Sequence, residues 1–91
     1  MRSEQMMATP TTGHPGNSFE IRWATATSSG VVYDVQRKRP GRTFKNWQVG
    51  VATASQSFVP ARKGTFQFRV KFRFVGGQSS TYSPILSITV N

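Results

Sequence analysis

The side chains of this sequence that could take part in chemistry are mostly cationic. The 91 residues include 12 Lys and Arg, one His, no Cys and only three acids, Glu4, Glu20 and Asp34, which gives a net charge of +9. Catalysis by a nucleophile, by an acid–base pair or by a metal needs groups that this set does not supply, because His14 has no Cys or paired carboxylates to act with. We therefore expect no enzyme activity, no cofactor and no metal site. The charge instead favours an anionic partner.

The clearest cationic pattern is in residues 66–74, which read FQFRVKFRF. Phe or Val occupies every second position, and Arg69, Lys71 and Arg73 lie between them. Alternate residues of a β-strand point to opposite faces of its sheet, so these three cations are expected on one face. Cations of two neighbouring segments complete a candidate anion-binding set: Lys38, Lys45, Arg69, Lys71 and Arg73. The loops add Arg37, Arg39, Arg42, Arg62 and Lys63.

The sequence leaves two interpretations of this set open. Outward positions of a sheet are polar by default, and Lys or Arg there hinders edge-to-edge aggregation. Alternatively, the set is a binding face for an anionic polymer, which the scarcity of acids favours, since Asp34 is the one acid expected nearby. Trp47 is similarly ambiguous, because it either closes an edge of the core or stacks on a sugar ring or a base. Nucleic acid has weak support as a partner, because the interleaved aromatic residues point into the core.

The elements that must position these residues are β-strands. Alternating apolar residues predict strands at residues 18–25, 31–38, 44–51, 55–59, 65–75 and 84–90. Polar segments predict loops at residues 25–30 and 76–83. In RPGR, at residues 39–42, Pro40 followed by Gly41 predicts a type II turn. Residues 1–17 are predicted to be a flexible N-terminal arm or linker, and residues 18–91 the domain.

These strands predict an all-β fold. No window has helical spacing, and turn signals recur about every 8–12 residues, which is typical of an antiparallel sandwich or small barrel. The aromatic content is high for so short a chain, so a few large side chains must supply most of the core. The residues expected between the layers are Trp23, Tyr33, Phe66, Phe68, Val70, Phe72, Ile88 and Val90.

Four segments make residues 19–90 resemble a fibronectin type III domain. They are FEIRW ending at Trp23, YDV at 33–35, FQFRV at 66–70, and the Gly- and Ser-rich GGQSSTYS ending at Ser83. The resemblance implies a seven-stranded antiparallel β-sandwich of the immunoglobulin-like class with a weak first strand. It also implies that the third and sixth strands are neighbours in one sheet. Their outward residues, Asp34 among them, would then lie side by side.

The function expected from the charge and the resemblance is that of a non-catalytic spacer or adhesion module of a larger extracellular protein, with a basic sheet face that binds anionic polymers. One alternative is a structural coat component of a virion surface or filament, which assembles through the sandwich and the arm. Another is a dedicated polyanion binder, for glycan or nucleic acid. The expected partners are a protein or an anionic polymer such as a cell-wall polymer or glycan, together with neighbouring domains or subunits in an assembly.

The sequence also gives expectations about location. It has no run of 18 apolar residues, so we expect no membrane span. Residues 1–17 lack the apolar stretch of a secretory signal. We therefore expect an excerpt of a longer protein or a part of an assembly, which is extracellular or on a cell or virion surface.

Overall fold

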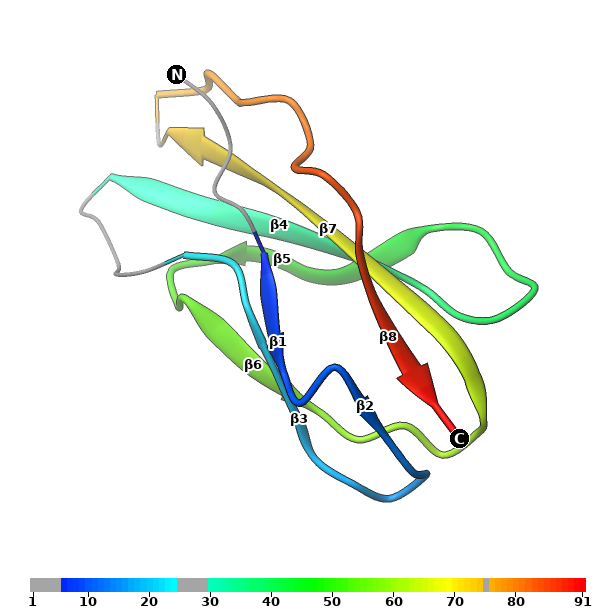
Figure 1. Cartoon of the computed structure of the whole chain (residues 1–91). Coiled ribbons are helices and arrows are strands. Elements are labelled where there is room, and N and C mark those ends of the chain that lie inside the picture. The colour runs from blue at the N-terminus through cyan, green and yellow to red at the C-terminus, as the bar shows by residue number, and fades with distance from the viewer. Residues whose placement is uncertain (1–5, 25–29, 75) are drawn as a thin grey trace.

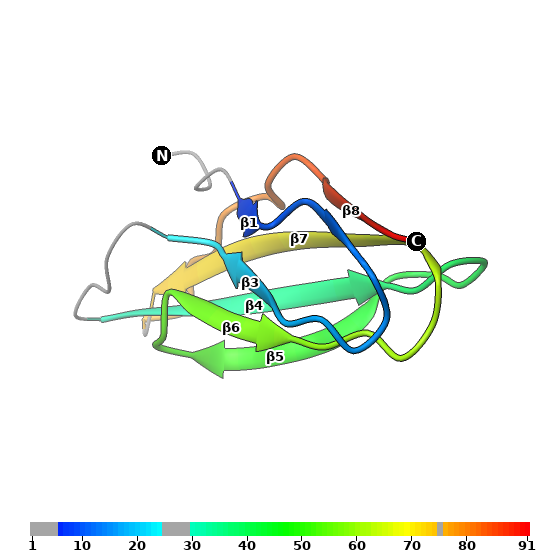
Figure 2. The ribbon, with the colours of Figure 1, turned by 60° about the horizontal axis from the view of Figure 1, so that its bottom comes forward.

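The chain folds into two facing β-sheets (Figure 1). The computed structural model describes residues 6–24, 30–74 and 76–91. Its strands are β1 (Met7–Thr9), β2 (Thr12–Gly13), β3 (Phe19–Arg22), β4 (Val31–Lys38), β5 (Lys45–Val51), β6 (Ser55–Phe58), β7 (Gly64–Phe74) and β8 (Leu86–Val90). One sheet has the order β1-β3-β6 and the other the order β2-β8-β7-β4-β5. Figure 2 shows the two layers from a second side. The predicted all-β, immunoglobulin-like sandwich is confirmed.

The weak first strand of the prediction is divided between the two sheets. β1 pairs antiparallel with β3, whereas β2 pairs parallel with β8. Pro10, which follows β1, has no amide proton to continue the ladder, so the chain leaves the first sheet there. This division adds a strand to the expected seven and introduces one parallel pair. Residues 7–13 thus belong to the sheets rather than to a flexible arm, and residues 1–5 of that arm lie outside the described residues.

Strands β4 and β7 form the centre of the larger sheet. They are the expected third and sixth strands, and they pair antiparallel along the whole of β4. The register places Asp34 opposite Lys71 and Gln36 opposite Arg69 on one face of the sheet. The period-two pattern of the sequence therefore becomes an apolar face toward the other sheet and a polar face toward solvent.

The core lies between the sheets and is largely aromatic. All eight residues predicted for it are buried, and Trp23 is fully buried. The indole nitrogen of Trp23 donates a hydrogen bond to the carbonyl oxygen of Thr53 at 2.8 Å, so its polar group is satisfied. From the smaller sheet, Phe19 and Ile21 are also fully buried. The burial of these side chains holds the two layers together.

The predicted turn at residues 39–42 is present at the tip of the β4–β5 hairpin. Gly41 has φ +72°, and the amide of Arg42 donates to the carbonyl oxygen of Arg39 at 3.0 Å. The ring of Pro40 lies against Gly64, the first residue of β7, because a Cβ built on Gly64 would be 2.5 Å from Pro40 Cγ. Only glycine allows this approach.

Several predictions concern residues that the structure does not describe. The loop predicted at residues 25–30 falls almost wholly on residues 25–29, and the last residue of the strand predicted at 65–75 is Val75; both lie outside the described residues. In the described part, no helix is long and apolar enough to span a membrane.

Candidate anion-binding site

Four of the five predicted anion-binding residues lie on the outer face of the larger sheet. Arg69, Lys71 and Arg73 come from β7 and Lys38 from β4, and all four are half-buried. The fifth residue, Lys45, is separated from them. Lys45 pairs with Arg37 on β4, and Arg37 pairs in turn with the buried Phe68 on β7. Paired residues lie on the same face of a sheet, so Lys45 lies on the inner face, opposite to the other four.

The inner position of Lys45 follows from plain alternation with Trp47, two residues later, and β5 becomes irregular beyond that point. The register between β4 and β5 shifts on either side of Val35, so Val35 pairs with Gln48 while its neighbour Gln36 pairs with Asn46. Such a bulge moves one residue of a strand out of the regular alternation. The sequence alone does not show where this shift occurs.

Arg73 is paired with the one carboxylate on this face. Its Nε donates to Asp34 Oδ2 at 2.6 Å and its Nη2 donates to Asp34 Oδ1 at 3.1 Å. The amide of Gly50 donates to the same Oδ1 at 2.9 Å. The hydrogen bond from Arg73 and the one from Gly50 hold the pKa of Asp34 below its ordinary value, against the opposing effect of burial.

Asp34 lies in the outward row, as expected, but it is buried there under Arg73, with only 6% of its surface exposed. The charge of Arg73 is thus largely balanced by Asp34 within the protein. Arg73 was predicted as an anion-binding residue, and here it forms an internal ion pair instead. The other cations of this surface, Lys38, Arg69 and Lys71, form no ion pair with a described carboxylate, and we call them the outer cationic face.

Arg69 is held by groups on both sides of β7. Its guanidinium carbon lies 4.3 Å from the centre of the Phe44 ring and 4.2 Å from that of Tyr82. Its Nε donates to Gln36 Oε1 at 2.8 Å. Lys71 Nζ lies 5.3 Å from the Tyr82 ring centre. These cation–π contacts fix the side chain of Arg69 at the centre of the outer cationic face.

Phe44 and Tyr82 were missed as members of this surface. Tyr82 is the one aromatic residue in the polar segment before β8, and that contrast is the signal that could have identified it. An aromatic side chain in such a segment needs a partner, and here the partner is the cationic row of β7.

Trp47 is part of the core edge. Its ring is half-buried, and its centre lies 6.4 Å from Trp23, 5.9 Å from Phe58 and 5.2 Å from Phe68. The angles between ring planes are 81° and 83° for Trp23 and Phe58, which are edge-to-face arrangements. The structure therefore places Trp47 as the residue that closes this edge, and not beside the outer cationic face.

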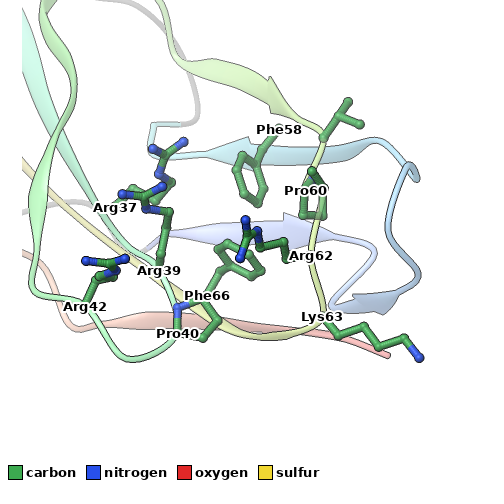
Figure 3. A pocket seen from close by; sticks show the side chains of 11 residues that line it. Arg37, Arg39, Pro40, Arg42, Phe58, Pro60, Arg62, Lys63 and Phe66 are labelled. Atoms are coloured by element: carbon green, nitrogen blue, oxygen red, sulfur yellow. The ribbon is translucent and has the colours of Figure 1, made fainter.

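A second group of cations surrounds an open cavity that the sequence analysis did not predict. The cavity has a volume of about 550 Å³ and lies between the β4–β5 hairpin and the loop from β6 to β7 (Figure 3). We call it the loop pocket. Its lining residues are Arg37, Arg39, Pro40, Arg42, Phe58, Val59, Pro60, Ala61, Arg62, Lys63 and Phe66. Five of these side chains are cationic and none is acidic.

Arg37 has the most unusual environment of these cations. It is half-buried, and its guanidinium carbon lies 5.7 Å from the centre of the Phe58 ring. Burial and the neighbouring charge of Arg39 lower the pKa of the Arg37 guanidinium from its ordinary value. Arg37 remains a cation, and a bound anion would offset its repulsion from Arg39.

The described acids do not neutralise either cationic group. Glu20 lies 3.4 Å from Arg22 on the smaller sheet, and Asp34 pairs with Arg73. Within the described ranges, no carboxylate pairs with a residue of the outer cationic face or the loop pocket. In the same ranges, no three His, Cys, Asp or Glu side chains are grouped as a metal would require.

No family model matches this sequence, and a search of the curated proteins finds no match. Among solved structures, the chain is similar to the PKD domain of an M14-like peptidase from Thermoplasmatales archaeon SCGC AB-540-F20. The TM-score is 0.61 at 19% identity, and the match covers 99% of this chain and 96% of that chain. At this identity the likeness shows the fold alone, an immunoglobulin-like β-sandwich. It does not single out the fibronectin type III family, which stays a prediction.

Proposed function

We propose that this chain is a non-catalytic immunoglobulin-like module of a larger protein, and that its outer cationic face attaches it to an anionic polymer. The observation that carries the proposal is that Lys38, Arg69 and Lys71 lie along two paired strands and that none of them forms an ion pair with a described carboxylate, although Asp34 lies opposite Lys71. Cations aligned along a sheet suit a ligand with repeating negative charge, because several contacts form with one extended chain.

The contacts of Arg69 support binding over simple solvation of the sheet. A solvated arginine samples many rotamers, whereas Arg69 is held by two rings and by Gln36. Its planar guanidinium is therefore positioned before a ligand arrives, which lowers the entropy lost on binding.

The role of the module, its location and the kind of polymer it binds belong to the same proposal. We favour a spacer or adhesion role in an extracellular or surface-exposed protein of fibronectin type III type over a coat role. Residues 7–13, which the coat hypothesis needed as part of a free arm, pair with β3 and β8 of the same chain. Nucleic acid is the less favoured polymer, because Trp47 and the phenylalanines of β7 are turned toward the core, and Phe44 and Tyr82, the aromatic residues of this face, already stack on Arg69.

The test is retention on immobilised polyanions, with dextran sulfate, polyglutamate and single-stranded polyuridylate as the three probes. We expect the double variant Lys38→Gln/Lys71→Gln to elute at a clearly lower salt concentration than the wild type. The matched control is Arg22→Gln/Lys45→Gln, which removes the same charge away from this face. Arg73 is left in place, because its loss would leave Asp34 buried without a partner.

Two results would contradict this proposal. Equal elution of the face variant and the wild type would exclude the outer cationic face. Equal losses in the face variant and the control variant would show that net charge, rather than a particular surface, causes retention.

A further inference from the structure

We infer that the loop pocket is a second, separate binding site, and that its ligand is an acidic sugar: a pyranose unit that carries a carboxylate, phosphate or sulfate. The inference does not depend on the outer cationic face, since no residue of that face lines the pocket. It rests on the charge of the pocket, on its apolar walls and on the contacts that fix its shape.

The charge of the pocket calls for an oxyanion. In Figure 3, Arg37 and Arg39 lie on one side of the cavity and Arg62 reaches in from the β6–β7 loop, whereas Lys63 extends away. Guanidinium groups present paired donors that match the oxygens of a carboxylate, phosphate or sulfate. No described acid lies among the lining residues, so these donors have no carboxylate partner within the pocket.

The apolar walls limit what can carry that oxyanion. Phe58 and Phe66 line the cavity but are only 7% and 4% exposed, and Pro40 and Pro60 add aliphatic surface. Rings this deeply buried offer no open face on which a nucleobase could stack. The aliphatic rings of Pro40 and Pro60 can contact the C–H groups of a sugar ring, a contact that needs no open aromatic face. A cavity of about 550 Å³ is within the range of roughly 300–1,000 Å³ that small-molecule sites occupy.

The pocket is formed before a ligand binds. The ring of Pro40 lies against Gly64, which fixes the hairpin that carries Arg39. On the other side, the amide of Gly16 donates to the carbonyl oxygen of Pro60 at 2.9 Å, which holds the β6–β7 loop. A site whose two loops are already positioned loses little conformational entropy on binding.

The experiment is a titration of the 91-residue chain followed by backbone amide chemical shifts. The probes are glucuronate, glucose 6-phosphate and glucose 6-sulfate, with glucose and inorganic phosphate as references. We expect saturable shifts for at least one acidic sugar at residues 37–42 and 58–66, and weaker binding of both references. Shifts confined to β4 and β7 above the outer cationic face would overturn the inference. Affinity for inorganic phosphate equal to that for every acidic sugar would also overturn it, because the sugar ring would then contribute nothing.

Matched variants test the assignment of residues. Arg37→Gln/Arg39→Gln/Arg62→Gln should weaken acidic-sugar binding by at least about tenfold, because it removes the charged hydrogen-bond donors of the pocket. The control Arg22→Gln/Lys38→Gln/Lys71→Gln removes the same charge outside the pocket and should leave that affinity nearly unchanged. Because Arg37 is half-buried, Arg39→Gln/Arg62→Gln is a second variant that keeps the core contact with Phe58.

These variants also separate the two proposals. If the face variant loses polyanion retention, the outer cationic face is the polymer site. If the same variant still binds the acidic sugar normally, the loop pocket is a separate site. Equal weakening of sugar binding in the pocket variants and in the control would refute the loop pocket, whatever the result of the column experiment.

Discussion

Asp34 shows how a single residue can depart from an otherwise correct pattern. Its place in the outward row follows from the alternation of β4, but its burial does not, because burial depends on Arg73 folding over it from the neighbouring strand. Asp34 Oδ1 also accepts a hydrogen bond from the Gly50 amide, at the register irregularity of β5. One carboxylate therefore joins three strands of the larger sheet.

We expect Asp34 to make stability depend on pH at the acid end. Its pKa is lower in the folded protein than in the unfolded chain, so the stabilisation is complete above about pH 4 and is lost as the pH falls through the folded-state pKa. Asp34→Asn should be less stable than the wild type at pH 7, and the difference in denaturant midpoint should shrink toward pH 2. A difference that is the same at both pH values would contradict this. Glu20→Gln, at an exposed pair, should change little.

Trp23 is the residue whose truncation we expect to be most damaging. It is fully buried and its indole nitrogen is hydrogen-bonded, so Trp23→Ala creates a large cavity and leaves the Thr53 carbonyl oxygen without this donor. The expected loss is about 3–5 kcal/mol, in a domain whose whole stability should be roughly 5–15 kcal/mol. Circular dichroism melting should show an absent or strongly lowered transition. Val49→Ala, at an exposed site of β5, is the control, and a cooperative melt of Trp23→Ala near the wild-type temperature would show that Trp23 is not central.

At the scale of elements, the contact between the β4–β5 hairpin and the start of β7 determines whether the loop pocket exists. Gly64 has φ +130°, a conformation that residues other than glycine rarely adopt. Pro40 also fills the space that a Cβ at this position would need. The hairpin, β7 and the β6–β7 loop thus meet at one point.

Gly64→Ala should therefore lower the free energy of unfolding by about 1–3 kcal/mol, the usual cost of a strained backbone position, with a further effect from the clash with Pro40. Chemical denaturation measures the loss. Gly76→Ala is the control, because a Cβ there meets nothing within 4 Å and Gly76 does not have a positive φ. Similar midpoints for the two variants would show that the hairpin tip is free to move.

The elements also show what the sequence could predict and why. Period-two alternation predicted β3 to β8 to within a few residues, and its physical basis is clearest in β3, β7 and β8, where buried residues alternate with more exposed ones. The division of β1 and β2 was not predicted, since short strands with few β-formers give little pattern. The loop pocket was not predicted either, because its arginines come from segments that meet only when Pro40 lies on Gly64.

For the whole molecule, the distribution of charge matters more than its sum. The described cations other than Arg22 belong to the larger sheet and to the loops beside it, while the smaller sheet carries the Glu20–Arg22 pair. We expect retention on a polyanion to fall steeply as salt rises toward 0.15 M, where the screening length is about 8 Å. The Lys38→Gln/Lys71→Gln variant should show a shallower dependence of log affinity on log salt, because fewer counterions are released. An identical slope would place the contacts elsewhere.

The parallel pairing of β2 with β8 has a mechanical consequence for a module linked to other domains. Its short ladder is closed by hydrogen bonds from the Thr89 amide to the Thr11 carbonyl oxygen at 3.0 Å and from the Asn91 amide to the Gly13 carbonyl oxygen at 2.7 Å. The two strands run in the same direction, so tension applied through the chain ends would pull them past each other. The bonds would then be loaded in shear and break together rather than one by one, so this small patch would resist stretching once tension has passed the β1–β3 pair.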